Sequence, residues 1–403
     1  MACLAAMGRD GGLGSDISMD DSARGALSRR DAIARMLAAT VALGATAGSA
    51  SAATLEAAAA HGGRFFGSAV KIDQLNSEQD LRDAVLRECF QLVPEYEMNW
   101  NSIEPVYGEL SFGKMDGLAA FAIHYGKRLR GHMLLWHLSV PQWADEMLRE
   151  RSDWDIIARY FASVIPRYGD VINTWEVVNE PIDVGHRMDG LRENVFLQAF
   201  GPDYISRALQ QARTFTPQGQ LLVNEYGLEY DNTEERDRRY LLLKLLERLK
   251  QTKAPIDGLG LQSHLDLSKG HVSQTAIVPF LREVADMGLS ITVTELDVKE
   301  ADYVASLADR DRMVADETRR YLDIVLNQPN VLGVTTWGLS DRHSWLEVTP
   351  QDYARFPGAW ADGTGPGLNR GLPLDSSMQP KPMYYAIRDA LWYAKRLRQI
   401  RRK

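Results

Sequence analysis

The stretch Thr174-Trp175-Glu176-Val177-Val178-Asn179-Glu180-Pro181 has the composition of a buried β-strand that ends abruptly. Trp and Val favour the pleated, buried surface of a sheet. Proline cannot donate a ladder hydrogen bond, so strand pairing should stop near Pro181. This places Asn179 and Glu180 at the C-terminal end of the strand. A lone carboxylate there is more often a member of a structural ion pair than a catalytic group, so the rest of the chain has to decide its role.

Seven further short apolar runs accompany this one along the chain. The eight runs cover residues 65–70, 89–93, 132–136, 171–178, 221–223, 259–261, 291–294 and 331–337. Continuous apolar runs indicate strands that are buried on both faces, as in parallel sheets. The segments between them often have helical patterns, most clearly at 240–249 and 319–326. Eight strand–helix units in series predict an α/β fold, a single (β/α)8 TIM barrel.

Polar residues follow the strands from the second to the eighth. They are Glu95 and Tyr96; His137; Asn179 and Glu180; Asn224, Glu225 and Tyr226; Gln262, Ser263 and His264; Glu295 and Asp297; and Trp337 with Gly338. The active sites of such barrels lie at the C-terminal ends of the strands. Because these polar side chains all meet at that rim, the sequence predicts a functional site there.

Two carboxylates at this rim, Glu180 and Glu295, come from the predicted fourth and seventh strands. A facing pair of carboxylates is the arrangement used for cleavage of a glycosidic bond. One of them must be protonated to donate to the leaving oxygen, and the other must be ionised to attack or to activate water. The pair therefore favours a catalytic role for Glu180 over the structural one.

The neighbours of the two carboxylates suggest which is which. Asp297 lies two residues after Glu295 and so on the same face of the strand, and His264 ends the neighbouring sixth strand. A histidine on its own is more often structural, but between two carboxylates it can hold Glu295 ionised. We expect Glu295 to be the nucleophile and Glu180 the acid/base, with Asn179 placed to bond a sugar hydroxyl.

Aromatic residues at the same rim point to a sugar substrate and not to a metal. Trp136, Trp337 and Trp345 offer indole faces on which pyranose rings can rest, although a single Trp at a strand end usually belongs to the core. His132 and His137 are not part of a tight Cys/His cluster with zinc spacing. We predict neither a metal nor a cofactor.

The first 53 residues are expected to be an export signal and not part of the fold. Arg29 and Arg30 precede a weakly apolar run at 36–47, and Ala50 and Ala52 have A-x-A spacing. This pattern predicts a twin-arginine signal and a periplasmic or extracellular location; an Ala-rich disordered tail is the alternative. The catalytic domain should then cover 54–403.

Composition limits the partners of this domain. The net charge of −8 argues against nucleic acid, and no other segment has the roughly 18 apolar residues that a membrane span requires. Outside the predicted signal the only cysteine is Cys89, in an apolar run, and it is expected to be a small buried hydrophobe. A long Gly- and Pro-rich loop at 346–370 should overhang the rim. The domain is expected to be a monomer.

Several segments, in order, resemble glycoside hydrolase family 10, the endo-1,4-β-xylanases. They are residues 67–70 (GSAV), 131–143 (GHMLLWHLSVPQW), 175–181 (WEVVNEP), 257–264 (DGLGLQSH), 294–297 (TELD), 337–345 (WGLSDRHSW) and 380–387 (PKPMYYAI). The resemblance implies a retaining mechanism with Glu180 as acid/base and Glu295 as nucleophile, supported by His264 and Asp297. It also implies that the sugar beside the cleaved bond is lined by His132, Trp136, His137, Asn179, Gln262, Trp337 and Trp345.

Residues 95–100 (EYEMNW) depart from the family pattern. Glu95 is retained, but the family usually has Asn where this chain has Tyr96, and Lys where it has Asn99. The resemblance implies that this segment binds sugar hydroxyls on the non-reducing side. Losing an ammonium donor there should weaken binding by about 1–3 kcal/mol if its partner stays buried.

Three functions are compatible with these residues. The first is a retaining endo-1,4-β-xylanase that hydrolyses internal β-1,4 bonds of xylan. The second is an exported β-glycosidase of the same class that acts on short xylo-oligosaccharides or another β-glycoside, because Tyr96, Asn99 and the 346–370 loop could narrow the cleft. The third is a non-catalytic xylan-binding protein, which the presence of both Glu residues disfavours.

Overall fold

The computed structural model describes residues 53–301, 303, 305–346 and 369–395. The predicted export signal (1–53, except its last residue), most of the 346–370 loop and residues 396–403 lie outside the described residues. Every residue predicted for the site falls within the described ranges.

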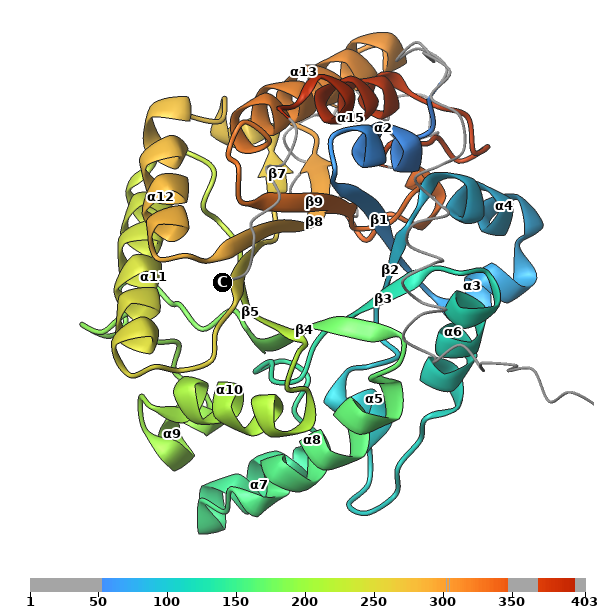
Figure 1. Cartoon of the computed structure of the whole chain (residues 1–403). Coiled ribbons are helices and arrows are strands. Elements are labelled where there is room, and N and C mark those ends of the chain that lie inside the picture. The colour runs from blue at the N-terminus through green and yellow to red at the C-terminus, as the bar shows by residue number, and fades with distance from the viewer. Residues whose placement is uncertain (1–52, 302, 304, 347–368, 396–403) are drawn as a thin grey trace, which may run out of the picture. The chain divides into compact units, whose positions relative to one another are not determined.

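A closed parallel barrel forms the centre of the fold (Figure 1). Its strands are β1 (Phe65–Val70), β2 (Gln91–Pro94), β3 (Arg128–Gly131), β4 (Ile172–Asn179), β5 (Gln220–Glu225), β6 (Gly258–Leu261), β8 (Ser290–Lys299) and β9 (Val331–Thr336). Each pairs in parallel with its neighbours, and the β1–β9 and β6–β8 pairings close the ring. The prediction of a single (β/α)8 barrel is confirmed.

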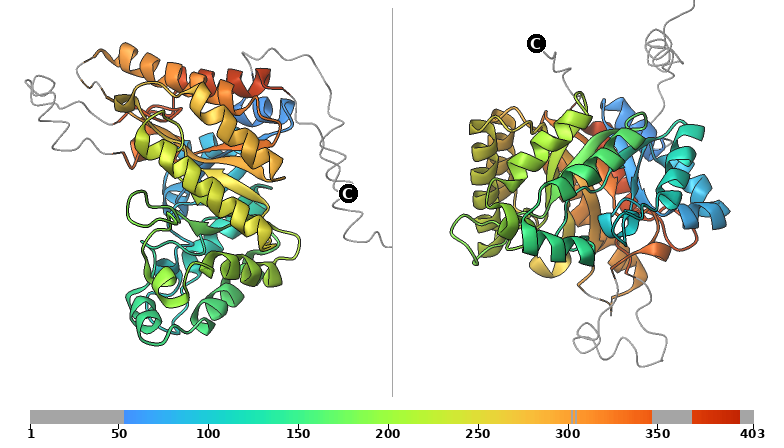
Figure 2. Two further views of the ribbon diagram at one scale, coloured as in Figure 1. Left: turned by 90° about the vertical axis from the view of Figure 1, so that its left-hand side faces the viewer. Right: turned by 90° about the horizontal axis from the view of Figure 1, so that it is seen from below.

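Helices surround the strands, as the side views also show (Figure 2). They are α2 (Leu55–His61), α3 (Ile72–Ser77), α4 (Gln79–Glu88), α5 (Trp100–Ile103), α6 (Gly113–His124), α7 (Gln142–Arg151), α8 (Asp155–Tyr168), α9 (Val195–Phe200), α10 (Tyr204–Phe215), α11 (Thr233–Gln251), α12 (Gln274–Asp286), α13 (Leu307–Val325) and α15 (Pro382–Tyr393), with short 3-10 turns η2 (Leu267–Lys269) and η3 (Asp341–His343). The helical patterns predicted at 240–249 and 319–326 fall within α11 and at the end of α13. Among the described helices, none combines the length and apolar character needed to cross a membrane.

Two predicted strand positions need correction, and one short strand was not predicted. The second strand begins at Gln91, because Cys89 caps the end of α4. The third strand is Arg128–Gly131, and the segment 132–136 predicted as a strand follows it with a single bridge, Leu135 to Val178. A short strand that was not predicted, β7 (His264–Asp266), pairs with the far end of β8.

The third strand was misplaced because its sequence looks polar although it is buried. Arg130 is fully buried and forms an ion pair with Glu176 of β4, which supplies the compensation that a buried guanidinium requires. Gly131 lies against the Trp175 ring, and a Cβ at this position would clash with that ring. A charge and a glycine therefore occupy positions where apolar residues are expected.

Residues from both ends of the described chain hold the ring closed. Arg64 precedes β1 and donates from Nε to the carbonyl of Val331 at 3.1 Å, across 267 residues of sequence. The buried Glu88 of α4 accepts the backbone N–H of Leu55 at 2.9 Å and the Tyr384 hydroxyl at 3.0 Å. Glu88 thus joins α4 to the first described helix, α2, and to the last, α15. Cys89, next to it, is a buried free thiol, as predicted, and burial raises its pKa well above the usual range.

Replacing Glu88 should destabilise the barrel. Glu88→Ala leaves the Leu55 N–H and the Tyr384 hydroxyl without their acceptor in a buried site, so we expect the free energy of unfolding to fall by about 3 kcal/mol. Chemical denaturation measures this value. The exposed Glu150 at the end of α7 provides the control, because Glu150→Ala should change it by less than about 0.5 kcal/mol. Equal effects of the two substitutions would contradict the role given to Glu88.

Candidate active site

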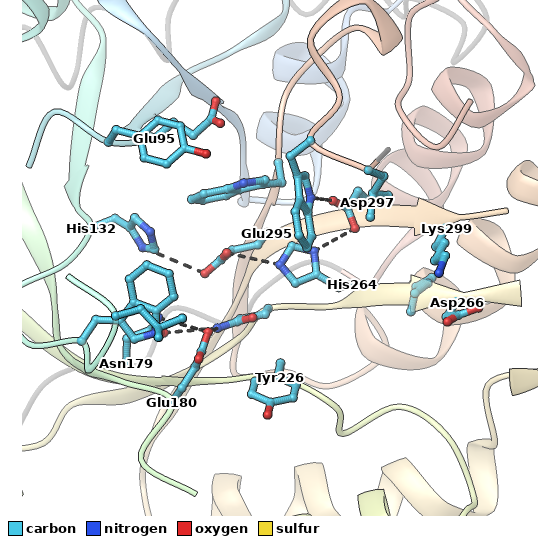
Figure 3. Close-up of a pocket in the computed structure, with 18 of the residues that line it drawn as sticks. Glu95, His132, Asn179, Glu180, Tyr226, His264, Asp266, Glu295, Asp297 and Lys299 are labelled. Carbon is cyan, nitrogen blue, oxygen red and sulfur yellow. Dashed lines mark hydrogen bonds and ion pairs between the residues drawn. The ribbon is translucent and has the colours of Figure 1, made fainter. Parts of the chain in front are cut away.

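A cavity of about 500 Å³ opens at the C-terminal ends of the strands (Figure 3). All the predicted site residues except Asn99 and His137 line it. Those that line it are Glu95, His132, Trp136, Asn179, Glu180, Gln262, His264, Glu295, Asp297, Trp337 and Trp345, and they are joined by Tyr96, Leu138, Tyr226, Leu265, Asp266, Lys269, Lys299 and Leu346. The strand ends thus bring together residues that are up to about 250 positions apart, as expected for this fold.

Glu295 is buried on β8 and is surrounded by hydrogen-bond donors. Asn224 Nδ2 donates to its Oε1 at 2.6 Å, and His264 Nε2 lies 3.4 Å from its Oε2. Burial by itself would raise the pKa of Glu295, but the hydrogen bond from His264 and the positive charges of His264 and Arg130 outweigh it and hold that pKa well below the usual range. Glu295 is therefore an ionised carboxylate at neutral pH.

His264 connects Glu295 to Asp297. The register of β7 on β8 sets His264 opposite Asp297, and His264 Nδ1 lies 2.8 Å from Asp297 Oδ1. The second oxygen of Asp297 accepts the indole N–H of Trp345 at 2.6 Å. Burial lowers the pKa of His264, but the two carboxylates raise it well above the ordinary value. The ring is then a cation between two anions, which fixes its orientation.

Glu180 has neutral partners. It follows β4 with a backbone φ of 54°, in the left-handed region that few non-glycine residues adopt. Its Oε1 accepts from the Gln262 amide at 3.0 Å and from the Asn179 amide at 3.4 Å. A non-glycine residue keeps a left-handed backbone conformation only where the surrounding structure holds it there, and such residues cluster at functional sites.

The backbone around Glu180 is held by the next strand and by a partly buried arginine, Arg192. Its N–H donates to the Asn224 carbonyl at 2.8 Å. Arg192 Nε donates to the Glu180 carbonyl at 2.9 Å, while its Nη2 donates to the Ile182 carbonyl at 2.9 Å and to the Tyr226 hydroxyl at 3.0 Å. These bonds fix the chain direction after β4 and with it the aim of the Glu180 side chain.

Asn224 lies between the two carboxylates. Its amide donates to Glu295 and, at 3.0 Å, to the side-chain oxygen Oδ1 of Asn179, while its own Oδ1 accepts the Thr294 hydroxyl at 2.8 Å. Asn179 in turn bonds Glu180. A continuous set of side-chain amides therefore connects Glu180 on β4 to Glu295 on β8, which sets their mutual position.

One group of residues has the donor types of a metal site. Ligand atoms of His132, Glu176 and Glu295 lie within 4.8 Å of one another. His132 Nδ1 is 2.8 Å from Glu176 Oε2, and Arg130 is paired with the other oxygen of Glu176. The guanidinium thus already supplies the positive charge that these carboxylates need, and the donor set fits an ion-pair network better than a cation site.

Asn99 and His137 lie outside the cavity lining. Asn99 is buried at the start of α5, where its carbonyl accepts the N–H groups of Ser102 and Ile103. His137 is half-buried, and burial together with the nearby Arg192 lowers its pKa to about 4. The sequence places both residues next to strand ends, but the turns that follow β2 and β3 lead them away from the cavity.

Comparisons with known proteins agree with this geometry. The model of Glycosyl hydrolase family 10 matches residues 54–390. Endo-1,4-beta-xylanase 1 of Humicola insolens is 32% identical over 306 residues, which are 74% of this chain and 68% of that protein. Endo-1,4-beta-xylanase A of Fusarium oxysporum f. sp. lycopersici is 29% identical over 82% of this chain and 96% of its own length.

Solved structures give the same result. The structure of native xylanase 10B from Thermotoga maritima superposes with a TM-score of 0.70 at 26% identity and covers 84% of this chain and 98% of its own. The xylanase 10B structure from Thermotoga petrophila, in complex with xylobiose, also gives 0.70 at 26% identity, over 84% and 97%. With the family model matching most of the chain, this protein belongs to glycosyl hydrolase family 10.

Proposed function

We propose that the protein is a retaining endo-1,4-β-xylanase. The observation that carries the proposal is the pairing, in one cavity, of an ionised Glu295 held by His264 with a Glu180 held by neutral amides. These are the different environments that a nucleophile and a proton donor need. The names of the family relatives, and the xylobiose in the Thermotoga petrophila complex, support xylan as the substrate.

The proposed reaction has two displacements. Glu295 attacks the anomeric carbon while the bond from that carbon to the glycosidic oxygen breaks, and Glu180 gives its proton to the departing oxygen. Glu180, now ionised, then takes a proton from water as the water oxygen attacks the same carbon and releases Glu295. Both carboxylates return to their starting protonation states. The second attack restores the original configuration of the sugar.

Aromatic and imidazole groups around Glu295 would form the sugar pocket. The His132 ring lies edge-on to Trp337 with centroids 4.9 Å apart, and the His264 ring lies edge-on to Trp345 at 5.2 Å. Trp136 lines the same cavity. Indole faces pack on the apolar faces of pyranose rings, while the surrounding amides and imidazoles bond hydroxyls.

Removing the proposed nucleophile should abolish hydrolysis. Glu295→Ala is expected to lower kcat on xylan by about a thousandfold or more, because no covalent intermediate can form. Reducing-sugar release from soluble xylan measures the loss. Glu109→Ala, at an exposed position outside the cavity, should leave the rate unchanged. Unchanged hydrolysis by the Glu295 variant would refute the assignment.

The charge of Asp297 should set the acidic limit of activity. Asp297→Asn removes one of the two anions that keep His264 protonated, so His264 loses proton affinity and stabilises ionised Glu295 less well. The pKa of Glu295, held low in the native protein, should then rise.

Activity requires ionised Glu295 and is lost as the pH falls through its pKa, so the acidic limb of the kcat/KM profile should move to higher pH. Rates measured across the acid range on one soluble substrate test this shift. The exposed Asp203→Asn variant should retain the native profile. An acidic limb that stays in place, or moves to lower pH, would contradict the proposed role of Asp297.

The products distinguish an endo-acting enzyme from one that prefers short oligosaccharides. An open cavity that accepts sugars on both sides of Glu295 should cut long xylan internally, so that a ladder of oligosaccharides appears before xylose accumulates. Time-resolved chromatography of the products of long xylan tests this expectation. Release of end units alone would instead favour the oligosaccharide-specific alternative.

A further inference from the structure

A lysine that the sequence pattern did not single out lies beside the active site. Lys71 directly follows β1, and its ammonium lies 3.1 Å from Glu95 Oε1. The same ammonium lies over the Tyr96 ring, 4.8 Å from its centroid. The pairing of Val70 on β1 with Pro94 on β2 brings these three residues together at the rim. Of this group, Glu95 and Tyr96 line the active-site cavity, and Lys71 lines an adjoining cavity of about 360 Å³ that it shares with Tyr96.

This group lies on the side of the cavity that should receive the non-reducing part of the substrate. In Figure 3, Glu95 and Glu180 lie on opposite sides of Glu295. A sugar whose anomeric carbon faces Glu295 and whose leaving oxygen faces Glu180 must extend its other end away from Glu180. The preceding sugar of the chain therefore lies towards Glu95 and Tyr96.

The chemistry of the group suits a sugar. Glu95 is buried, and burial raises its pKa while the charge of Lys71 opposes that rise. An ammonium has three N–H donors, and the contact with Glu95 uses one of them. The Lys71 side chain is 33% exposed and Tyr96 is 51% exposed, so both are open to a ligand. A carboxylate, an ammonium and a phenol ring together offer acceptors, donors and an apolar surface.

Asn99 does not contribute to this group, because it is buried outside the cavity lining. An ammonium is nevertheless present beside Glu95, and it comes from the end of β1. The expected loss of a cationic donor in residues 95–100 is therefore compensated by a different element of the barrel.

The family resemblance already implies that residues 95–100 bind the sugar that precedes the one over Glu295. We infer that Lys71, from a different element of the barrel, supplies the ammonium donor of that site and determines how strongly the enzyme prefers substrates with two sugars on the non-reducing side. The inference rests on the proposed function and adds a specificity-determining residue to it.

Two aryl glycosides test this inference on the full-length protein. In 4-nitrophenyl β-xyloside a single sugar lies over Glu295, whereas 4-nitrophenyl β-xylobioside also fills the site beside Lys71. Loss of a charged hydrogen bond in Lys71→Met should lower kcat/KM on the xylobioside about tenfold and on the xyloside far less. The ratio of the two values should fall accordingly.

Lys244→Met is the matched control, because the exposed Lys244 is paired with Glu247 at 2.9 Å and lines neither the active-site cavity nor the adjoining one beside Lys71. It should retain the native ratio. Lys71→Arg should restore most of the ratio through its retained charge, and Tyr96→Ala, at an exposed position, should lower it even if Lys71→Met folds poorly.

A native ratio in both Lys71→Met and Tyr96→Ala would overturn the inference, as would equal losses on the two substrates. Failure of the unmodified protein to cleave either aryl glycoside or xylan would instead contradict the proposed function itself. The two failures are therefore distinguishable.

Discussion

The buried charge of Glu295 is the constraint on which the organisation of the barrel rim depends. An ionised carboxylate inside a protein is stable only when charges and hydrogen-bond donors replace the water it has lost. Here Asn224 donates to it, and the cationic His264 lies beside it. Each of these needs its own support: Thr294 orients Asn224, while Asp297 holds His264 and is itself held by Trp345. The ends of β5, β7 and β8, and Trp345 beyond β9, are therefore linked because each helps to stabilise one anion.

The side chain of Glu180, unlike that of Glu295, has no charged partner among the described residues. Its hydrogen-bond donors are neutral amides from Gln262 and Asn179. Its position is set through the backbone, by Arg192 and by the carbonyl of Asn224. The two carboxylates of the cavity thus depend on different interactions. Glu295 depends on charged partners, and Glu180 on the hydrogen bonds that fix its backbone. The side chains of Asn224 and Asn179 nevertheless link the two carboxylates and set their mutual position.

The sequence was most informative where local pattern and tertiary environment agree. The first and eighth strands are apolar runs, and the structure places strands at 65–70 and 331–336. The carboxylates and their partners could be found because they follow such strands. The third strand could not, because Arg130 is buried by an ion pair with a residue of another strand, which no local pattern reports. The positions of Asn99 and His137 depend on the turns that follow β2 and β3, and no local sequence pattern reports the geometry of those turns either. Lys71 could have been found, because it directly follows the first strand as the other polar residues follow theirs. The direction of its side chain, however, depends on its ion pair with Glu95 at the end of β2, which the sequence alone does not show.

The pairing of β1 with β9 also has a consequence for synthesis of the chain. β1 is made first, yet one of its two neighbours, and the carbonyl of Val331 that Arg64 binds, appear 267 residues later. At roughly 5–20 residues per second, one edge of β1 stays unpaired for about 13–50 s in every round of translation. During that time an apolar strand edge is open to other chains. The ring cannot close until β9 has been made.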